Sequence, residues 1–204
     1  MTIFPPFFHL QYLNNMTTLD NPQPVINETE VPFLPTAIRL GLIGSLIFIV
    51  YSLIANLTGL SVPTSIAVSL LNLIIALGVT IGFVIYVIRY HRDKELGGYI
   101  SFGRAFLLAF AALVISTIIS NIFNWVYLSF IDTSHLESVL EATEKMMSDM
   151  GAPADAIEKQ MSTMREQFTP MGMMVQGLKY GLIGGAVIAL ICAAIMKKKP
   201  DITV

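Results

Sequence analysis

Residues 40–88, LGLIGSLIFIVYSLIANLTGLSVPTSIAVSLLNLIIALGVTIGFVIYVI, contain no Asp, Glu, Lys or Arg. Gly59 and Pro63 divide this stretch, and each part is long enough to cross a bilayer as a helix of roughly 20 residues. The whole chain of 204 residues is 54% hydrophobic and 13% charged, against roughly 25% charged residues in a typical globular protein. This composition predicts an integral membrane protein and excludes a disordered chain or a nucleic-acid-binding protein with a basic face.

Four segments have the length and composition of a membrane span. They are residues 37–57, 65–88, 102–131 and 177–196. Pro35 prevents the first helix from extending backwards, and Thr36 is its predicted N-cap. We therefore expect an all-α fold, with a four-helix membrane bundle in residues 36–199. A Pro-rich extended tail over residues 1–35 precedes it, and a short tail over residues 200–204 follows.

The segment between the third and fourth spans has a different character. Residues 132–168 carry eight acidic and three basic residues. In the second half, apolar residues recur at steps of three and four from Ala154 to Phe168, as on one face of a helix. In the first half, Leu136, Val139, Leu140, Met147 and Met150 form a similar apolar face. Gly151 and Pro153 separate the two halves. The pattern predicts an amphipathic helical hairpin that lies outside the bilayer core.

The basic residues predict the orientation of the bundle. They gather after the second span and after the fourth, and the first loop has none. Because short loops rich in Lys and Arg stay in the cytoplasm, we expect both termini on the inner side. The hairpin over residues 132–168 is then on the outer side.

A set of amide side chains lies within the predicted spans, all in the half nearest the hairpin. The set comprises Asn56, Asn72, Asn121 and Asn124. Polar residues inside a membrane are candidates for function. These amides could form an outward-facing polar pocket, or they could hold the helices together by hydrogen bonds. No Asp, Glu, Lys or Arg is predicted at mid-membrane, which argues against a proton-coupled pump.

Small residues recur every four positions along the fourth span. They are Gly177, Gly181, Gly185 and Ala189. Such a ridge lets another helix approach closely. It could pack within the four-helix bundle, or it could form the contact face of a homodimer.

The loop between the second and third spans is the most organised polar stretch. Its candidate binding residues for lipid headgroups or a partner are Arg89, His91, Arg92, Lys94, Gly97, Gly98, Tyr99 and Arg104. The alternative is that these bases only fix the topology. Two adjacent glycines allow a tight reversal, and Ser101 is a predicted N-cap for the third span.

Residues 91–106, HRDKELGGYISFGRAF, resemble the hallmark of a bacterial domain-of-unknown-function family of small four-span membrane proteins. The resemblance extends over most of the chain, from about residue 35 to about residue 199. It implies a four-span architecture in the bacterial inner membrane, with an acidic extramembrane segment before the fourth span. The family has no assigned activity, so the resemblance implies no catalytic residues.

No catalytic constellation and no metal-binding spacing of Cys and His is evident in the sequence. We therefore expect no cofactor, no metal and no enzymatic activity. The leading hypothesis is a non-enzymatic accessory or envelope-interaction subunit. The alternative is a small oligomeric transporter or channel that uses the asparagine layer. The expected partners are the lipid bilayer and either a second copy of the chain or another membrane protein, with no nucleic acid.

Overall fold

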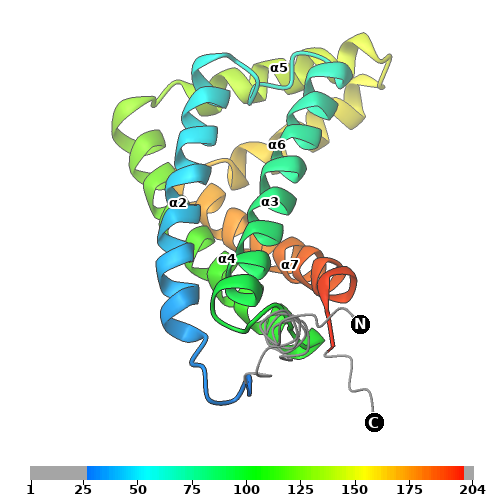
Figure 1. Cartoon of the computed structure of the whole chain (residues 1–204). Coiled ribbons are helices and arrows are strands. Elements are labelled where there is room, and N and C mark those ends of the chain that lie inside the picture. Colours follow the sequence, from blue (N-terminus) through cyan, green and yellow to red (C-terminus); the bar gives the residue numbers. More distant parts are fainter. Residues whose placement is uncertain (1–26, 200–204) are drawn as a thin grey trace, which may run out of the picture.

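The computed structural model describes residues 27–199, and this part of the chain is helical (Figure 1). Its elements are α2 (Leu34–Leu57), α3 (Ile66–Lys94), α4 (Phe102–Val126), the π-helix η1 (Tyr127–Ile131), α5 (His135–Asp149), α6 (Ala154–Gln167) and α7 (Pro170–Met196). Within residues 27–199, four helices, with α4 and η1 counted as one, are long and apolar enough to cross a membrane. The all-α class is confirmed for this part of the chain. The predicted tails lie largely outside the described residues.

The helices extend beyond some of the predicted spans. The uncharged run predicts a second span that ends at residue 88, whereas α3 continues to Lys94. The sequence predicts a fourth span from residue 177, whereas α7 begins at Pro170. Apolar composition marks only the part of a helix that lies in lipid, and the backbone hydrogen bonds continue beyond it.

Of the two predicted N-caps, Thr36 is wrong and Ser101 is confirmed. Thr36 does not cap α2, because the helix already begins at Leu34 and Phe33 is at the N-cap position. The hydroxyl of Thr36 donates instead to Glu95, 59 residues away in sequence. The cap at the start of α4 is confirmed, because the hydroxyl of Ser101 accepts the backbone N–H of Arg104 at 3.3 Å.

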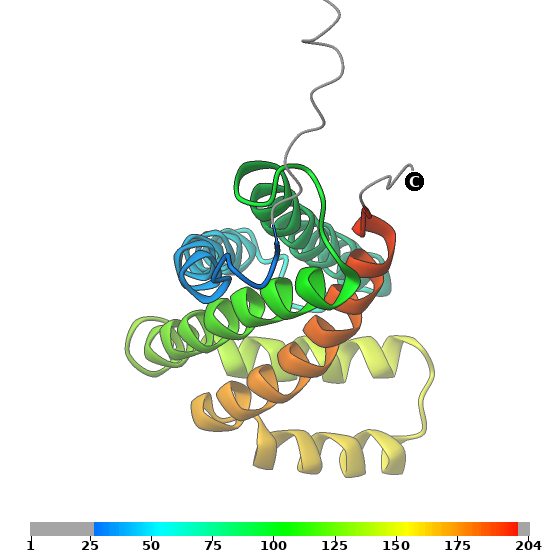
Figure 2. The same ribbon diagram turned by 60° about the horizontal axis from the view of Figure 1, so that its bottom comes forward.

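Helix α4 is the centre of the bundle, with α2 against one side and α7 against the other (Figures 1 and 2). Small residues make the α2–α4 contact close, since Ser116 of α4 donates a hydrogen bond to the carbonyl of Gly41 at 2.8 Å. We call the end that carries α5 and α6 the hairpin end, and the end that carries residues 95–101 the loop end.

Helix α3 packs tightly only near the loop end. Phe83, Val84, Val87 and Ile88 are buried there. No residue of α3 in the range 66–82 is buried. The outer surface of the bundle is apolar, with Leu46 62% and Ile74 65% exposed, as expected for helices whose outward faces contact lipid.

Two buried apolar clusters hold the structure together. The larger lies toward the loop end and joins α2, α3, α4 and α7 through residues such as Leu40, Val84 and Leu108. The smaller lies at the hairpin end, where Tyr127 and Leu128 pack with Leu136 of α5. The smaller cluster joins α5 to the bundle of long apolar helices.

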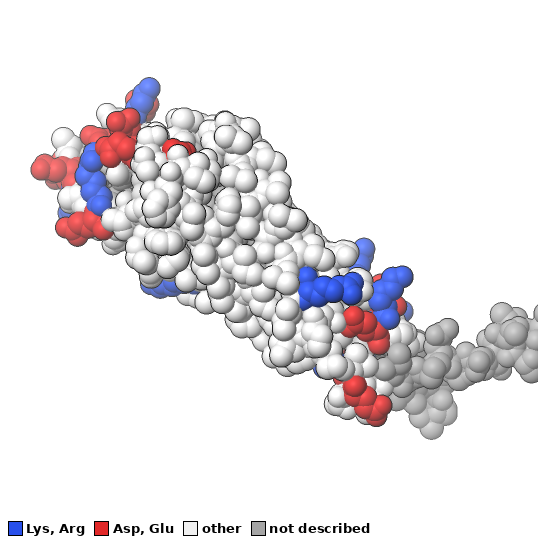
Figure 3. All heavy atoms as spheres, turned by 90° about the vertical axis from the view of Figure 1, so that its left-hand side faces the viewer, with Lys and Arg blue, Asp and Glu red and all other residues white. Residues whose placement is uncertain are grey.

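Charged side chains gather mainly at the two ends of the molecule on the face that Figure 3 shows. The belt between them is largely uncharged. This distribution fits a bundle whose middle lies in the hydrocarbon core of a bilayer.

Gly44 is the position where the α2–α4 contact is least tolerant of a larger residue. A Cβ atom there would overlap the ring of Phe83 and the hydroxyl of Ser116. We expect Gly44→Ala to lower the free energy of unfolding by about 1–3 kcal/mol, because overpacking forces neighbours to move.

Gly78→Ala is the matched control, because nothing lies within 4 Å of a Cβ added to Gly78. This variant should change stability by less than about 1 kcal/mol. The measurement is unfolding in mixed micelles, followed by circular dichroism. Equal stability of the two variants would contradict the close contact of α2 with Phe83 of α3 and Ser116 of α4.

Candidate functional site

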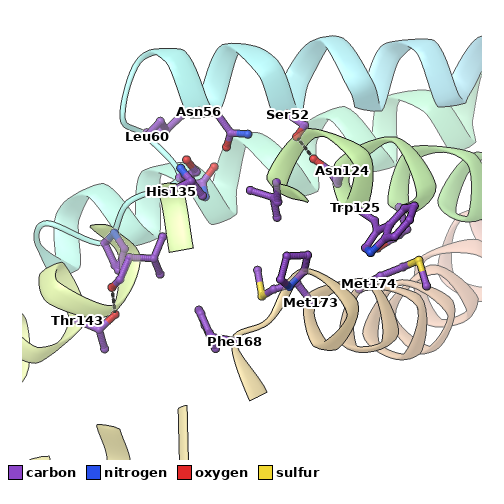
Figure 4. A pocket seen from close by; sticks show the side chains of 18 of the residues that line it. Ser52, Asn56, Leu60, Asn124, Trp125, His135, Thr143, Phe168, Met173 and Met174 are labelled. Atoms are coloured by element: carbon purple, nitrogen blue, oxygen red, sulfur yellow. Dashed lines mark hydrogen bonds between the residues drawn. The ribbon is translucent and has the colours of Figure 1, made fainter. Parts of the chain in front are cut away.

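The four predicted asparagines line one cavity at the hairpin end, with a volume of about 510 Å³. The cavity lies among α2, α3, α4 and α7, and α5 contributes to its rim. Figure 4 shows Asn56 and Asn124 on its wall. The helix pairing thus brings together amides that lie up to 68 residues apart in sequence, from Asn56 to Asn124.

Two of these amides connect helices and still have free donors. Ser52 of α2 donates to Oδ1 of Asn124 on α4 at 2.6 Å. Tyr51 of α2 donates to Oδ1 of Asn72 on α3 at 2.5 Å. Among the described residues, neither amide nitrogen has a hydrogen-bond acceptor. These side chains thus connect helices and also line the cavity, and a functional polar pocket stays a prediction.

Asn121 lies at the contact between α4 and α7. Its amide nitrogen donates to the backbone carbonyl of Thr117, one turn earlier on α4, at 2.8 Å. Its side chain lies so close to Gly177 that a Cβ atom on that glycine would overlap it. Asn121 therefore helps to set the distance between α4 and α7 as well as lining the cavity.

The rim of the cavity combines aromatic, thioether and imidazole groups (Figure 4). Trp125, Met173, Met174 and Phe168 line it, together with His135 at the start of α5. Nδ1 of His135 lies 3.7 Å from the carboxylate of Asp132, three residues earlier in the chain. Among the residues that the structure describes, no Asp, Glu, Lys or Arg lines the cavity.

Two smaller cavities continue from the first toward the middle of the bundle. One includes Tyr51, Asn72 and Thr80 in its lining, and the other includes Thr80, Asn121 and Gly184. Because adjoining cavities share lining residues, they form one feature, which we call the crevice. The large apolar cluster closes it toward the loop end.

The small residues of α7 face α4. A Cβ atom on Gly181 would lie 2.9 Å from the methyl group of Thr117, and one on Gly185 would lie 3.4 Å from Leu113. Ala189 is fully buried. The ridge therefore packs within the chain, and a homodimer through α7 stays a prediction.

A buried polar network occupies the loop end. His91 is fully buried, and its Nδ1 lies 2.5 Å from the carboxylate of Glu95. Its Nε2 accepts a hydrogen bond from Nε of Arg104 at 3.1 Å. Because a guanidinium can only donate, Nε2 carries no proton and Nδ1–H donates to Glu95. His91 is therefore neutral in this arrangement.

The network extends to the residues before α2. Arg104 donates to the backbone carbonyl of Val31, and its guanidinium lies over the ring of Phe33 at 5.1 Å. The carboxylate of Glu28 accepts hydrogen bonds from the backbone N–H and the hydroxyl of Ser101. Residues 28–33, which the sequence analysis assigned to an extended tail, are thus fastened to the loop end.

The other predicted loop residues have several roles. Arg92 pairs with Asp93 at 2.7 Å, and Arg89 and Lys94 are exposed. Gly97 and Gly98 have φ angles of 66° and 94°, as the predicted reversal requires. Tyr99 lies beneath the ammonium of Lys198, 5.5 Å from the ring centroid. Binding of lipid headgroups or a partner by this loop stays a prediction.

The comparisons give the chain a family. The model of the family described as "Protein of unknown function (DUF4199)" matches residues 39–198. The chain belongs to the DUF4199 family. Comparison with curated proteins and with solved structures finds no match. The match includes all four apolar helices, apart from the first residues of α2, so the crevice lies within the DUF4199 region. Of the network, His91, Glu95, Ser101 and Arg104 lie within it, and the partners from Glu28 to Thr36 precede it.

The sequence did not predict several residues of the crevice and of the polar network at the loop end. The hydroxyls of Ser52 and Thr80 line the crevice, and no spacing in the sequence distinguishes them from ordinary helix residues. Glu95 could have been found, since it lies four residues after His91 on the same helical face. Among the described residues, no three of His, Cys, Asp and Glu are grouped so that they could hold a metal ion.

The Glu95 carboxylate is the shared acceptor of the network. We expect Glu95→Ala to lower the free energy of unfolding by about 1–3 kcal/mol, because buried donors on His91 and Thr36 lose their partner. Asp93→Ala is the matched control. It removes a half-exposed ion pair and should cost less than about 1 kcal/mol. Thermal unfolding in detergent measures both, and equal losses would show that the network adds no stability.

Proposed function

We propose that this DUF4199 protein is a non-enzymatic accessory protein of the membrane, which works by binding a molecule in the crevice at its hairpin end. The observation that carries the proposal is the asymmetry of the bundle. Its hairpin half contains a cavity of about 510 Å³ with amide and hydroxyl groups on its wall. Its loop half is packed with fully buried residues such as Leu40, Val84 and Leu108. Concave sites with a few convergent polar groups are typical of ligand binding.

The bases at the loop end support the proposed orientation. This end carries Arg39, Arg89, Arg92, Lys94, Arg104 and the three lysines at 197–199. The positive-inside rule would place the loop end in the cytoplasm and the hairpin on the outer side. In this proposal the membrane is a bacterial inner membrane, and the crevice opens away from the cytoplasm.

The hairpin supports a role in contacts within the cell envelope. Helices α5 and α6 lie side by side, and Glu137 and Arg165 pair across them at 3.3 Å (Figure 2). Only Leu136 and Leu140 of α5 and Met161 of α6 are buried. The remaining surface of the hairpin is free to meet other molecules beside the mouth of the crevice.

The openness of the crevice can be tested with single cysteines. The native Cys192 is buried and is first replaced by Ala. In that background, we expect Asn124→Cys to react with a membrane-impermeant maleimide added outside intact cells, because Asn124 lines the crevice. Ala112→Cys is the control and should stay unlabelled, because Ala112 is fully buried.

Labelling of Asn124→Cys from neither side of the membrane would contradict the proposed binding site. Labelling only in inside-out vesicles would contradict the proposed orientation. The reaction is measured by the mass of the purified chain, so each variant also reports its own expression and recovery.

Binding and conduction make different predictions. Because the apolar cluster closes the crevice toward the loop end, reconstituted wild-type protein should give no solute or ion flux above that of empty vesicles. The measurement is dye release and ion flux from proteoliposomes. A flux that Asn72→Ala or Asn121→Ala abolishes, with the fold retained, would replace the accessory role by that of a transporter or channel.

A further inference from the structure

The crevice has an opening toward the surrounding lipid as well as toward the hairpin end. The third cavity of the crevice, nearest the middle of the bundle, has a volume of about 270 Å³. Its lining includes Thr80 of α3 and Tyr180 and Gly184 of α7. Tyr180 is 63% exposed, and nothing lies within 4 Å of a Cβ added to Gly184. Along residues 66–82, α3 has no buried residue. The gap between α3 and α7 is therefore a sideways entrance.

The free amide donors occupy only one part of the crevice. Asn72 and Asn124 line the two cavities nearer the hairpin end and are not in the lining of the third. The third cavity, nearer the middle of the bundle, combines hydroxyl groups such as that of Thr80 with the apolar side chains of Phe48 and Ile188. A molecule that matches this wall has a hydrogen-bonding head toward the hairpin end and an apolar chain toward mid-membrane. The same polarity runs through one leaflet of a bilayer.

The wall favours an uncharged head. Its lining contains no Asp, Glu, Lys or Arg, and His135 at the rim has a carboxylate beside it. Lys179, the one basic residue of α7, does not line the crevice and lies over the ring of Tyr180, 5.4 Å from its centroid. A phosphate group placed here would be taken out of water without a cationic partner, which is costly.

The unpaired amide N–H groups on the crevice wall favour a ligand with oxygen atoms that accept hydrogen bonds. The Oδ1 atoms of Asn72 and Asn124 are already paired with Tyr51 and Ser52. Their Nδ2 groups have no acceptor among the described residues, so each can donate to a ligand. Hydroxyl, ester and ether oxygens are uncharged groups that accept such hydrogen bonds.

We infer that the crevice binds a lipid with an uncharged, hydroxyl-bearing headgroup, of the diacylglycerol or glycosyl diacylglycerol class, which enters between α3 and α7. The headgroup lies against Asn72 and Asn124, and one acyl chain follows the wall past Gly184. This inference rests on the proposed binding role of the crevice and names its ligand.

The single tryptophan of the chain makes the inference measurable, because Trp125 lines the crevice. The purified full chain is placed in nanodiscs of phosphatidylcholine that contain a small, fixed mole fraction of a lipid with brominated acyl chains. Bromine quenches the fluorescence of a nearby indole. The test lipids are dibrominated diacylglycerol, dibrominated glucosyl diacylglycerol and dibrominated phosphatidylglycerol. We expect both uncharged lipids to quench Trp125 more than phosphatidylglycerol does at equal mole fraction.

Two variants test the head and chain positions separately. Asn72→Leu removes one free donor and should lower the relative affinity for the uncharged lipids about fivefold, as for one lost hydrogen bond. Gly184→Leu places a side chain in the third cavity, where an added Cβ would meet nothing within 4 Å, and should abolish the preference. Their controls are Gln176→Leu, whose amide pairs with Gln167 outside the crevice, and Gly78→Leu, whose Cβ meets nothing within 4 Å.

Equal quenching by all three lipids, or stronger quenching by phosphatidylglycerol, would overturn the inference. So would a preference that Gly184→Leu leaves intact, provided that its unfolding midpoint matches that of Gly78→Leu. The cysteine-labelling test distinguishes failure of the proposed binding site from failure of the proposed ligand. If Asn124→Cys is labelled but no lipid is preferred, the crevice stands as a binding site and only the named ligand is wrong.

Discussion

The structure depends on the constraint that lipid offers no hydrogen bonds, so each polar group in the apolar part of the bundle needs a partner within the protein or a cavity to face. At the loop end, Glu95 accepts from His91 and Thr36, and Arg104 completes the network. At the hairpin end, the amides instead surround the crevice. The two polar regions therefore meet the same constraint in different ways, the first by internal pairing and the second by enclosing space.

The crevice follows from how unevenly the helices approach one another. Glycines let α2 and α7 come close to α4, and a side chain at Gly44 or Gly181 would press on its neighbours. Helix α3 has no such close contact along residues 66–82 and reaches the core only from Phe83 onward. Three tightly packed helices and one that diverges leave a gap toward the hairpin end. The hydrogen bond from Tyr51 to Asn72 limits this divergence.

The sequence predicts the helices well because long uncharged runs have few alternatives to a membrane span. It also places the asparagines in one half of the bundle, since alternate spans run in opposite directions. It does not predict how each helix is rotated about its axis, and the long-range pairs depend on that rotation. The contact of Thr36 with Glu95 joins residues 59 apart, and that of Glu28 with Ser101 joins residues 73 apart. The π-helix at Tyr127–Ile131 likewise has no signal in composition or spacing.

The closed core between the two polar regions has a functional consequence. Val84 and Leu108 belong to the packed cluster on the loop-end side of the crevice, and both are fully buried. A molecule in the crevice therefore meets packed side chains rather than a path across the membrane, and the network around His91 is shielded from it. Close packing resists small displacements, so the loop end forms a rigid base, whereas residues 66–82 of α3 have no buried side chain to hold them in place. The proposed binding role depends on this difference, because a site closed on one side and loosely packed on the other can admit a molecule without opening a path through the bundle.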